Sequence, residues 1–131
     1  MDDLKKKSEI LIEKMKKDRG YIYPEWEFAA RNDPDFLEAY NNLYKAGLNE
    51  GKALPIKVRE LVALGVLAFR GDIDGIKSHI LRAMRFGATK EEIFDAIETI
   101  IIPGGAPTYF NGLQALMLTL KELEEQNSGK K

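Results

Sequence analysis

The chain has 131 residues, a length typical of one domain, and we expect residues 1–131 to form a single domain with its own hydrophobic core. Its 20 basic and 21 acidic residues nearly cancel, which argues against nucleic acid as a partner. Cysteine is absent, which excludes disulfides, thiolate metal ligands and thiol nucleophiles. No apolar run reaches about 18 residues and the N-terminal segment is too charged for a signal peptide, so we expect no membrane partner and a cytoplasmic location.

The first third of the chain is expected to be helical. Apolar residues recur at helical spacing, and Asp33-Pro34 is a typical helix start, because Asp supplies an N-cap oxygen and Pro fits the first turn. Gly47 and Gly51 then indicate a loop. The predicted helices cover residues 4–18, 25–30 and 34–45.

The remaining chain carries clear capping signals. Asp72 is expected to cap a helix, and Thr89 with Glu92 forms a capping box at the start of another. Apolar residues surround most of the axis of the helix over 56–70, so we expect a central, buried helix there. The Pro103–Pro107 segment is expected to stop a helix. The predicted helices cover residues 56–70, 73–86, 89–102 and 108–125. No strand signal competes, so the fold class is all-α, a bundle of six or so helices with short loops.

Two residues in this part of the chain indicate a small-molecule site. Glu60 lies on the apolar stripe of its helix, and His79, the single histidine, faces inward on the next helix. The short turn between the helices brings Glu60 about 15 Å and His79 about 11 Å along the axis from the same end, so they lie at similar levels. A carboxylate and an imidazole that share a pocket could act as general base and acid.

The same residues also fit a purely structural role. An inward histidine is often a satisfied core residue, and a buried glutamate is often an ion-pair partner. Gly75, one turn before His79, costs about 1 kcal/mol in a helix, which close approach of a ligand or another backbone would justify. With one histidine and no cysteine, no metal site is expected.

Two further features are candidates for binding a substrate carboxylate. Gly104 and Gly105 could expose backbone N–H groups to an anion, although we favour a tight turn between helices. Arg59, Arg70 and Arg82 could each bind a carboxylate through a bidentate pair, but surface or intersubunit ion pairs are the more common role of such residues.

Residues 54–116 resemble the carboxymuconolactone decarboxylase / alkylhydroperoxidase D-like (AhpD-like) family. The resemblance is carried by Arg59-Glu60-Leu61, Ser78-His79, Ala83, Gly87-Ala88-Thr89, Glu92-Ile93 and Gly105-Ala106-Pro107. It implies an all-α, AhpD-like helical bundle that assembles as a trimer or a hexamer. The unusually apolar segment from Phe94 to Ile102 also indicates a homo-oligomer.

The resemblance separates two kinds of chemistry. Glu60 and His79 match the glutamate and histidine of the family's peroxidases, but Asp72 and Gly75 stand where those enzymes have cysteines, so thiol peroxidase activity is excluded. The decarboxylases of the family need no cysteine and no cofactor, and they act on 4-carboxymuconolactone.

By resemblance we expect a cofactor-independent lyase that acts on a small carboxylated lactone or cyclic compound. His79 and Glu60 would be its catalytic residues. The substrate would be bound by Arg59, Gly75, Gly104 and Gly105. The alternative is a non-catalytic oligomeric module that binds a small molecule.

Overall fold

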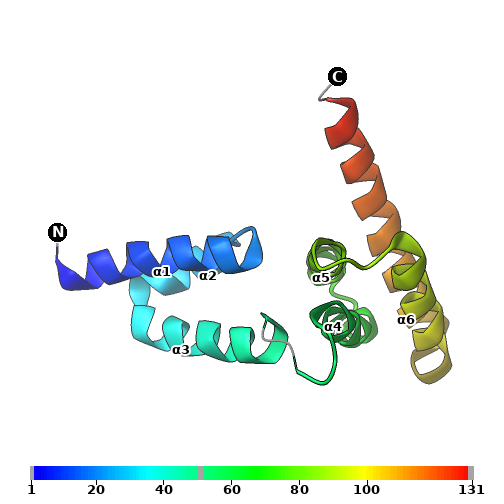
Figure 1. Ribbon diagram of the computed structural model, residues 1–131, viewed down its shortest axis with the longest axis horizontal. Helices are drawn as coiled ribbons and strands as arrows, with labels where there is room; N and C mark the ends of the chain where they lie inside the picture. The colour runs from blue at the N-terminus through cyan, green and yellow to red at the C-terminus, as the bar shows by residue number, and fades with distance from the viewer. Residues whose placement is uncertain (1, 50–51, 130–131) are drawn as a thin grey trace. The chain divides into compact units, whose positions relative to one another are not determined.

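The computed structural model describes residues 2–49 and 52–129 (Figure 1). Within these residues the chain is helical and contains no strand, which confirms the predicted all-α class. It divides into two compact units, Met1–Gly51 and Lys52–Lys131, and each is described by itself. The expectation of a single domain over residues 1–131 stays a prediction. None of the described helices is both long enough and apolar enough to cross a bilayer.

The first unit consists of α1 (Asp3–Arg19), α2 (Pro24–Asn32) and α3 (Pro34–Tyr44), followed by a π-helical turn over Lys45–Asn49. Asp33 accepts a hydrogen bond from the Phe36 N–H, so the predicted cap of α3 is confirmed. The loop predicted at Gly47 is wrong, because helical structure continues through it. Gly47 does not adopt a positive φ, so nothing in its backbone interrupts the helix. Gly51, the other predicted loop residue, lies outside the described residues.

A buried arginine organises the core of this unit. The Arg19 side chain is nearly buried, and its guanidinium lies 3.9 Å from the centroid of the Tyr44 ring. One of its nitrogens donates to Asn41 Oδ1 at 2.6 Å. An aromatic face and an amide oxygen together stabilise a cation that burial would otherwise disfavour. This pairing joins the end of α1 to α3.

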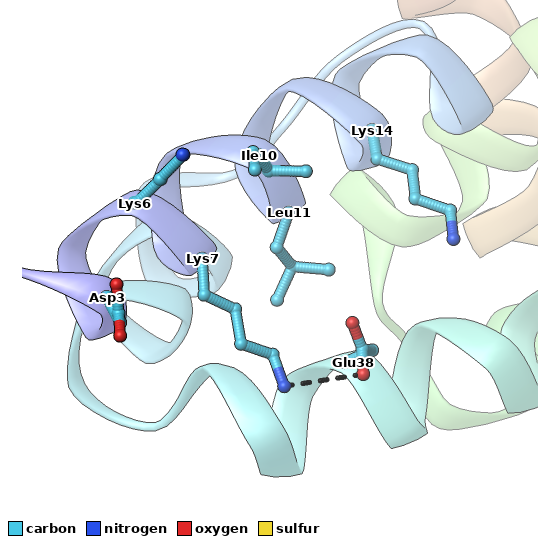
Figure 2. A pocket seen from close by; sticks show the side chains of 7 residues that line it. All are labelled: Asp3, Lys6, Lys7, Ile10, Leu11, Lys14 and Glu38. Atoms are coloured by element: carbon cyan, nitrogen blue, oxygen red, sulfur yellow. Dashed lines mark ion pairs between the residues drawn. The ribbon is translucent and has the colours of Figure 1, made fainter.

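A groove also lies along α1 of this unit (Figure 2). Lys7 and Leu11 point from α1 toward α3, where Lys7 pairs with Asp35 and Glu38. The hydrogen bond with Asp35 raises the pKa of Lys7, and the lysine is held to the neighbouring helix. The residues that line the groove are Asp3, Lys6, Lys7, Ile10, Leu11, Lys14 and Glu38.

The second unit contains α4 (Ile56–Arg70), α5 (Ile73–Arg85) and α6 (Lys90–Ser128). Two predicted caps are confirmed: Asp72 accepts from the Gly75 N–H at 3.0 Å, and Thr89 and Glu92 form a reciprocal capping box. These local hydrogen bonds satisfy the free N–H groups at the starts of α5 and α6. They explain why the predicted starts of both helices agree closely with the structure.

The helix α6 has two arms that meet at Gly105. Gly105 adopts φ 81° and ψ 176°, which is not helical, and the chain reverses direction there (Figure 1). Across the turn, Ile97 and Gly112 are in close contact, and a Cβ on Gly112 would lie 2.9 Å from Ile97. The prediction that Pro103–Pro107 ends one helix before the next begins is therefore confirmed, although the two arms follow each other without an intervening loop.

Replacing Gly105 with alanine is expected to destabilise the protein by about 1–3 kcal/mol, because a side chain is strained in this backbone conformation. Chemical denaturation measures the change. Gly47→Ala is the matched control, since a Cβ at Gly47 meets nothing within 4 Å. Equal stability of the two variants would contradict the strain assigned to Gly105.

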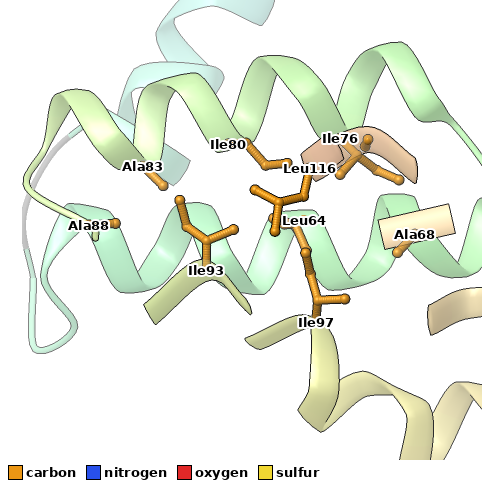
Figure 3. Packing of buried hydrophobic residues seen from close by; sticks show 10 residues of the cluster. Leu64, Ala68, Ile76, Ile80, Ala83, Ala88, Ile93, Ile97 and Leu116 are labelled. Carbon is orange, nitrogen blue, oxygen red and sulfur yellow. The ribbon is translucent and has the colours of Figure 1, made fainter. Parts of the chain in front are cut away.

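The core of the second unit is formed by all three helices (Figure 3). Its buried residues are Leu64, Ala68, Ile76, Ile80, Ala83, Ala88, Ile93, Ile97, Ala115 and Leu116. α5 and α6 cover only one side of α4, whose buried residues are Glu60, Leu64 and Ala68. On its other side Val62, Val66 and Phe69 are 59%, 58% and 70% exposed. The prediction that α4 is buried around most of its axis is therefore wrong for this chain.

An ion pair between Lys57 and Glu92 joins the starts of α4 and α6, at 2.9 Å. The hydrogen bond with Lys57, followed by the one with the Thr89 backbone, lowers the pKa of Glu92 below its ordinary value. A carboxyl with a lowered pKa in the folded state stabilises the fold above its unfolded pKa. That contribution is lost as the pH falls through the folded pKa.

Lys57→Met is expected to raise the pKa of Glu92 toward its ordinary value and so weaken this acid-range contribution. Carboxyl ¹³C NMR titration measures it. Lys52→Met is the control, because Lys52 is exposed just before α4. If the pKa of Glu92 in Lys57→Met equals that in Lys52→Met and in the wild type, the ion pair does not lower it.

Candidate active site

Glu60 is the most deeply buried charged residue of α4, with 0% of its surface exposed. It is followed by Leu64 and Ala68 at helical spacing, so all three lie on the side of α4 that is covered. The predicted inward orientation of Glu60 is confirmed. A carboxylate in this position needs hydrogen-bonding partners to offset its desolvation.

His79 supplies the first of these partners. Its Nδ1 atom lies 2.5 Å from Glu60 Oε2, and its side chain keeps 16% of its surface exposed. The short Gly71–Asp72 turn between α4 and α5 sets the two residues at the same level, as the rise per residue predicts. The structure thus brings together the two residues that the sequence singled out.

Arg82 supplies the second partner. Its Nε donates to Glu60 Oε1 at 2.9 Å, and only 2% of the residue is exposed. His79 and Arg82 are three positions apart on α5, so both face α4. The expectation of a surface or intersubunit ion pair is wrong for Arg82, which makes a buried pair within the chain. This i, i+3 spacing is the signal in the sequence that identifies it.

The arrangement fixes how the imidazole can act. When the ring is neutral, an Nδ1–H that donates to Glu60 leaves the lone pair on Nε2. No described residue hydrogen-bonds with Nε2. The carboxylate orients the ring and stabilises the imidazolium that forms when Nε2 takes a proton. The Glu60–His79 pair can therefore exchange a proton at Nε2.

Gly75 has a structural explanation. A Cβ at this position would lie 2.5 Å from a carboxylate oxygen of Asp72, the residue that caps α5. The neighbour that accounts for this glycine is the side chain of Asp72, and not the ligand or second backbone expected from the sequence. Binding of substrate by Gly75 stays a prediction.

The other predicted binding residues are separate from the Glu60 contacts just described. Gly104 and Gly105 form the turn of α6, where Thr108 donates to the Gly104 carbonyl at 2.8 Å. Arg59 is half-buried on α4, next to Glu60, and Arg70 is exposed at the end of α4. A role for any of them toward a substrate stays a prediction.

The described residues contain no group of three or more His, Cys, Asp or Glu side chains placed to hold a metal ion. Both carboxylate oxygens of Glu60 are engaged by side chains of α5. Glu60 Oε2 contacts His79, which can be protonated, and Glu60 Oε1 accepts a hydrogen bond from the cationic Arg82. The carboxylate of Glu60 and the imidazole of His79 are groups suited to proton transfer.

The fold and this pair define the protein as an all-α protein with a buried carboxylate–histidine site. The carboxymuconolactone decarboxylase family model matches residues 34–117. The chain belongs to the carboxymuconolactone decarboxylase family. The match begins at the start of α3, some way before the residues that carry the resemblance in the sequence.

Individual proteins are also similar to this chain. The uncharacterized protein MJ1511 of Methanocaldococcus jannaschii is 36% identical over 91 residues, which cover 70% of this chain and 84% of the relative. A second uncharacterized protein of that organism, MJ0742, is 34% identical over 86 residues, which cover 60% of this chain and 83% of the relative. The fold is similar to that of a "putative carboxymuconolactone decarboxylase" from Burkholderia xenovorans LB400, with a TM-score of 0.79, 24% identity and 98% of each chain covered.

Proposed function

We propose that the protein is a cofactor-independent lyase that decarboxylates a small carboxylated lactone or cyclic compound, with 4-carboxymuconolactone as the reference substrate. The observation that carries the proposal is the contact between His79 Nδ1 and Glu60 Oε2, which leaves Nε2 as the proton-exchanging atom. His79 is the general acid and base, and Glu60 orients it. Membership of the decarboxylase family supports the reaction class.

The reaction needs one proton transfer from the protein. The carbon–carbon bond to the carboxylate breaks, CO₂ leaves, and the bonding electrons enter the conjugated lactone as a dienolate. His79 in its protonated form gives the Nε2 proton to the carbon α to the lactone carbonyl, and the enol-lactone product forms. The ring then recovers a proton from water, while Glu60 stabilises the imidazolium.

The proposed substrate carries a second negative charge that must be held in place. Arg59 is the candidate, because it is half-buried and adjoins Glu60 on α4. A guanidinium binds a carboxylate through two parallel hydrogen bonds. Gly75 and the Gly104–Gly105 turn contact the substrate through their backbone N–H groups in this proposal.

We also infer a homo-oligomer, a trimer or a hexamer, and a cytoplasmic location. Exposed apolar residues in the first arm of α6 support the assembly: Phe94 is 37% exposed and Ile102 is 85% exposed. Burial of such side chains in an interface is favourable.

The proposal is tested by turnover of 4-carboxymuconolactone, followed by ultraviolet absorbance and confirmed by NMR of the product. The same lactone with its carboxylate esterified is the matched control, because it cannot lose CO₂. Consumption of the free acid alone supports the lyase. Equal rates with and without protein would contradict it for this substrate.

The alternative is a non-catalytic module that binds a small molecule. It is favoured by one observation: Glu60 is fully buried with both oxygens engaged, so a ligand can reach the site only at His79. Such a module binds the lactone without turnover. Isothermal titration calorimetry beside the absorbance assay separates the two functions.

A further inference from the structure

One carboxylate in the second unit serves two cationic or protonatable side chains. Glu60 Oε2 contacts His79 Nδ1 at 2.5 Å, and Glu60 Oε1 accepts from Arg82 Nε at 2.9 Å. Glu60 is fully buried and Arg82 is 2% exposed. The guanidinium of Arg82 also lies 5.7 Å from the centroid of the Phe86 ring.

The net charge of the cluster formed by Glu60, His79 and Arg82 depends on whether His79 is protonated. Arg82 carries a permanent positive charge, opposite in sign to the Glu60 carboxylate that it contacts. The cluster is therefore neutral when His79 is neutral, and it carries one positive charge when His79 is protonated. Without Arg82, the buried carboxylate would have His79 as its remaining partner and would hold the proton on the ring.

We propose that Arg82 is a positioning residue that acts on His79 through Glu60. By neutralising Glu60, it lets the imidazole release its proton while the hydrogen bond still fixes the ring. The proposal rests on the proposed function, because it assigns to Arg82 the control of proton transfer at His79. It also predicts that an anionic substrate, which balances the extra positive charge, favours the protonated form of the ring.

The helices packed around the cluster carry further charged groups. On α6, which packs against both helices, Glu92 pairs with Lys57 of α4 and Glu122 pairs with Lys77 of α5. On α4, Arg59 adjoins Glu60 in the sequence. Within residues 52–129, the ion pairs recorded for Glu60 are those with His79 and Arg82.

The titration of His79 can be followed directly, because it is the single histidine of the chain. The Cε1–H signal of the 131-residue chain in a ¹H–¹³C NMR spectrum then reports its protonation without any substrate. Arg82→Gln is expected to move the midpoint upward, because it removes a positive charge that shares the Glu60 carboxylate with the ring. Arg85→Gln is the matched control, since it removes the same charge from an exposed position on α5.

A second pair of variants covers the case in which Arg82→Gln does not fold. Glu60→Gln removes the negative charge that contacts the ring and leaves the positive charge of Arg82, so the midpoint is expected to fall below that of the wild type. The double variant Glu60→Gln with Arg82→Gln removes both charges, and its midpoint is expected to lie above that of Glu60→Gln. Each comparison isolates the charge of Arg82.

The proposal is overturned if the His79 midpoint of Arg82→Gln equals those of the wild type and Arg85→Gln. It is also overturned if Glu60→Gln and the double variant have the same midpoint. A purely structural role of Arg82 would lower stability without moving these midpoints. The titration needs no turnover, so it can be interpreted even if the protein does not decarboxylate the lactone. The two proposals therefore fail separately.

Discussion

Replacing Glu60 with alanine is expected to destabilise the protein by about 3–5 kcal/mol. The change removes the carboxylate partner of Arg82, whose charge is then buried without it. It also removes the acceptor for His79 Nδ1 and leaves a cavity between α4 and α5. Urea denaturation followed by circular dichroism gives the free energy of unfolding.

Two control variants separate the possible causes of this loss. Glu60→Gln keeps the size of the side chain and an oxygen that can accept from Arg82, so it is expected to cost less than alanine. Glu98→Ala removes an exposed glutamate from α6 and is expected to change the free energy of unfolding by less than about 0.5 kcal/mol. If Glu60→Ala were as mild as Glu98→Ala, the buried cluster would not stabilise the fold.

The second large effect is expected on catalysis. His79→Gln should lower kcat for 4-carboxymuconolactone by about 10²–10⁴-fold, the usual contribution of a positioned general acid. The glutamine amide can still donate to Glu60 but cannot supply a proton to carbon. The absorbance assay under saturating substrate measures the change.

The stability of this variant distinguishes chemistry from folding. Because the hydrogen bond to Glu60 can be kept, His79→Gln is expected to unfold at nearly the same urea concentration as the wild type. Arg85→Gln, on the same helix, should leave kcat unchanged. A wild-type kcat for His79→Gln would remove His79 from the proposed mechanism.

Much of the fold could be predicted because its signals are local. The starts of α3, α5 and α6 are set by caps within a few residues of the chain, at Asp33, Asp72 and Thr89. The contact between Glu60 and His79 was also predictable, because a short turn fixes two antiparallel helices at a common level. In both cases the distance along the chain determines the geometry.

The features that were missed depend on what surrounds each residue. Helical periodicity shows that α4 is apolar, but it does not show that α5 and α6 leave Val66 and Phe69 exposed. Arg82 was placed in a surface or intersubunit pair because arginines are mostly exposed, whereas here a buried carboxylate holds it. The reason for Gly75 is the conformation of the Asp72 side chain, which the sequence does not specify.

Decarboxylation in D₂O by the wild-type protein, with the product analysed by NMR, tests most directly that the protein itself supplies the proton. Delivery from His79 Nε2 to one face of the bound dienolate predicts product with a single deuterium in one configuration at the carbon α to the lactone carbonyl. Deuterium in both configurations equally, at early time points, would show that bulk solvent protonates a released intermediate. That result would contradict the acid–base role of the Glu60–His79 pair.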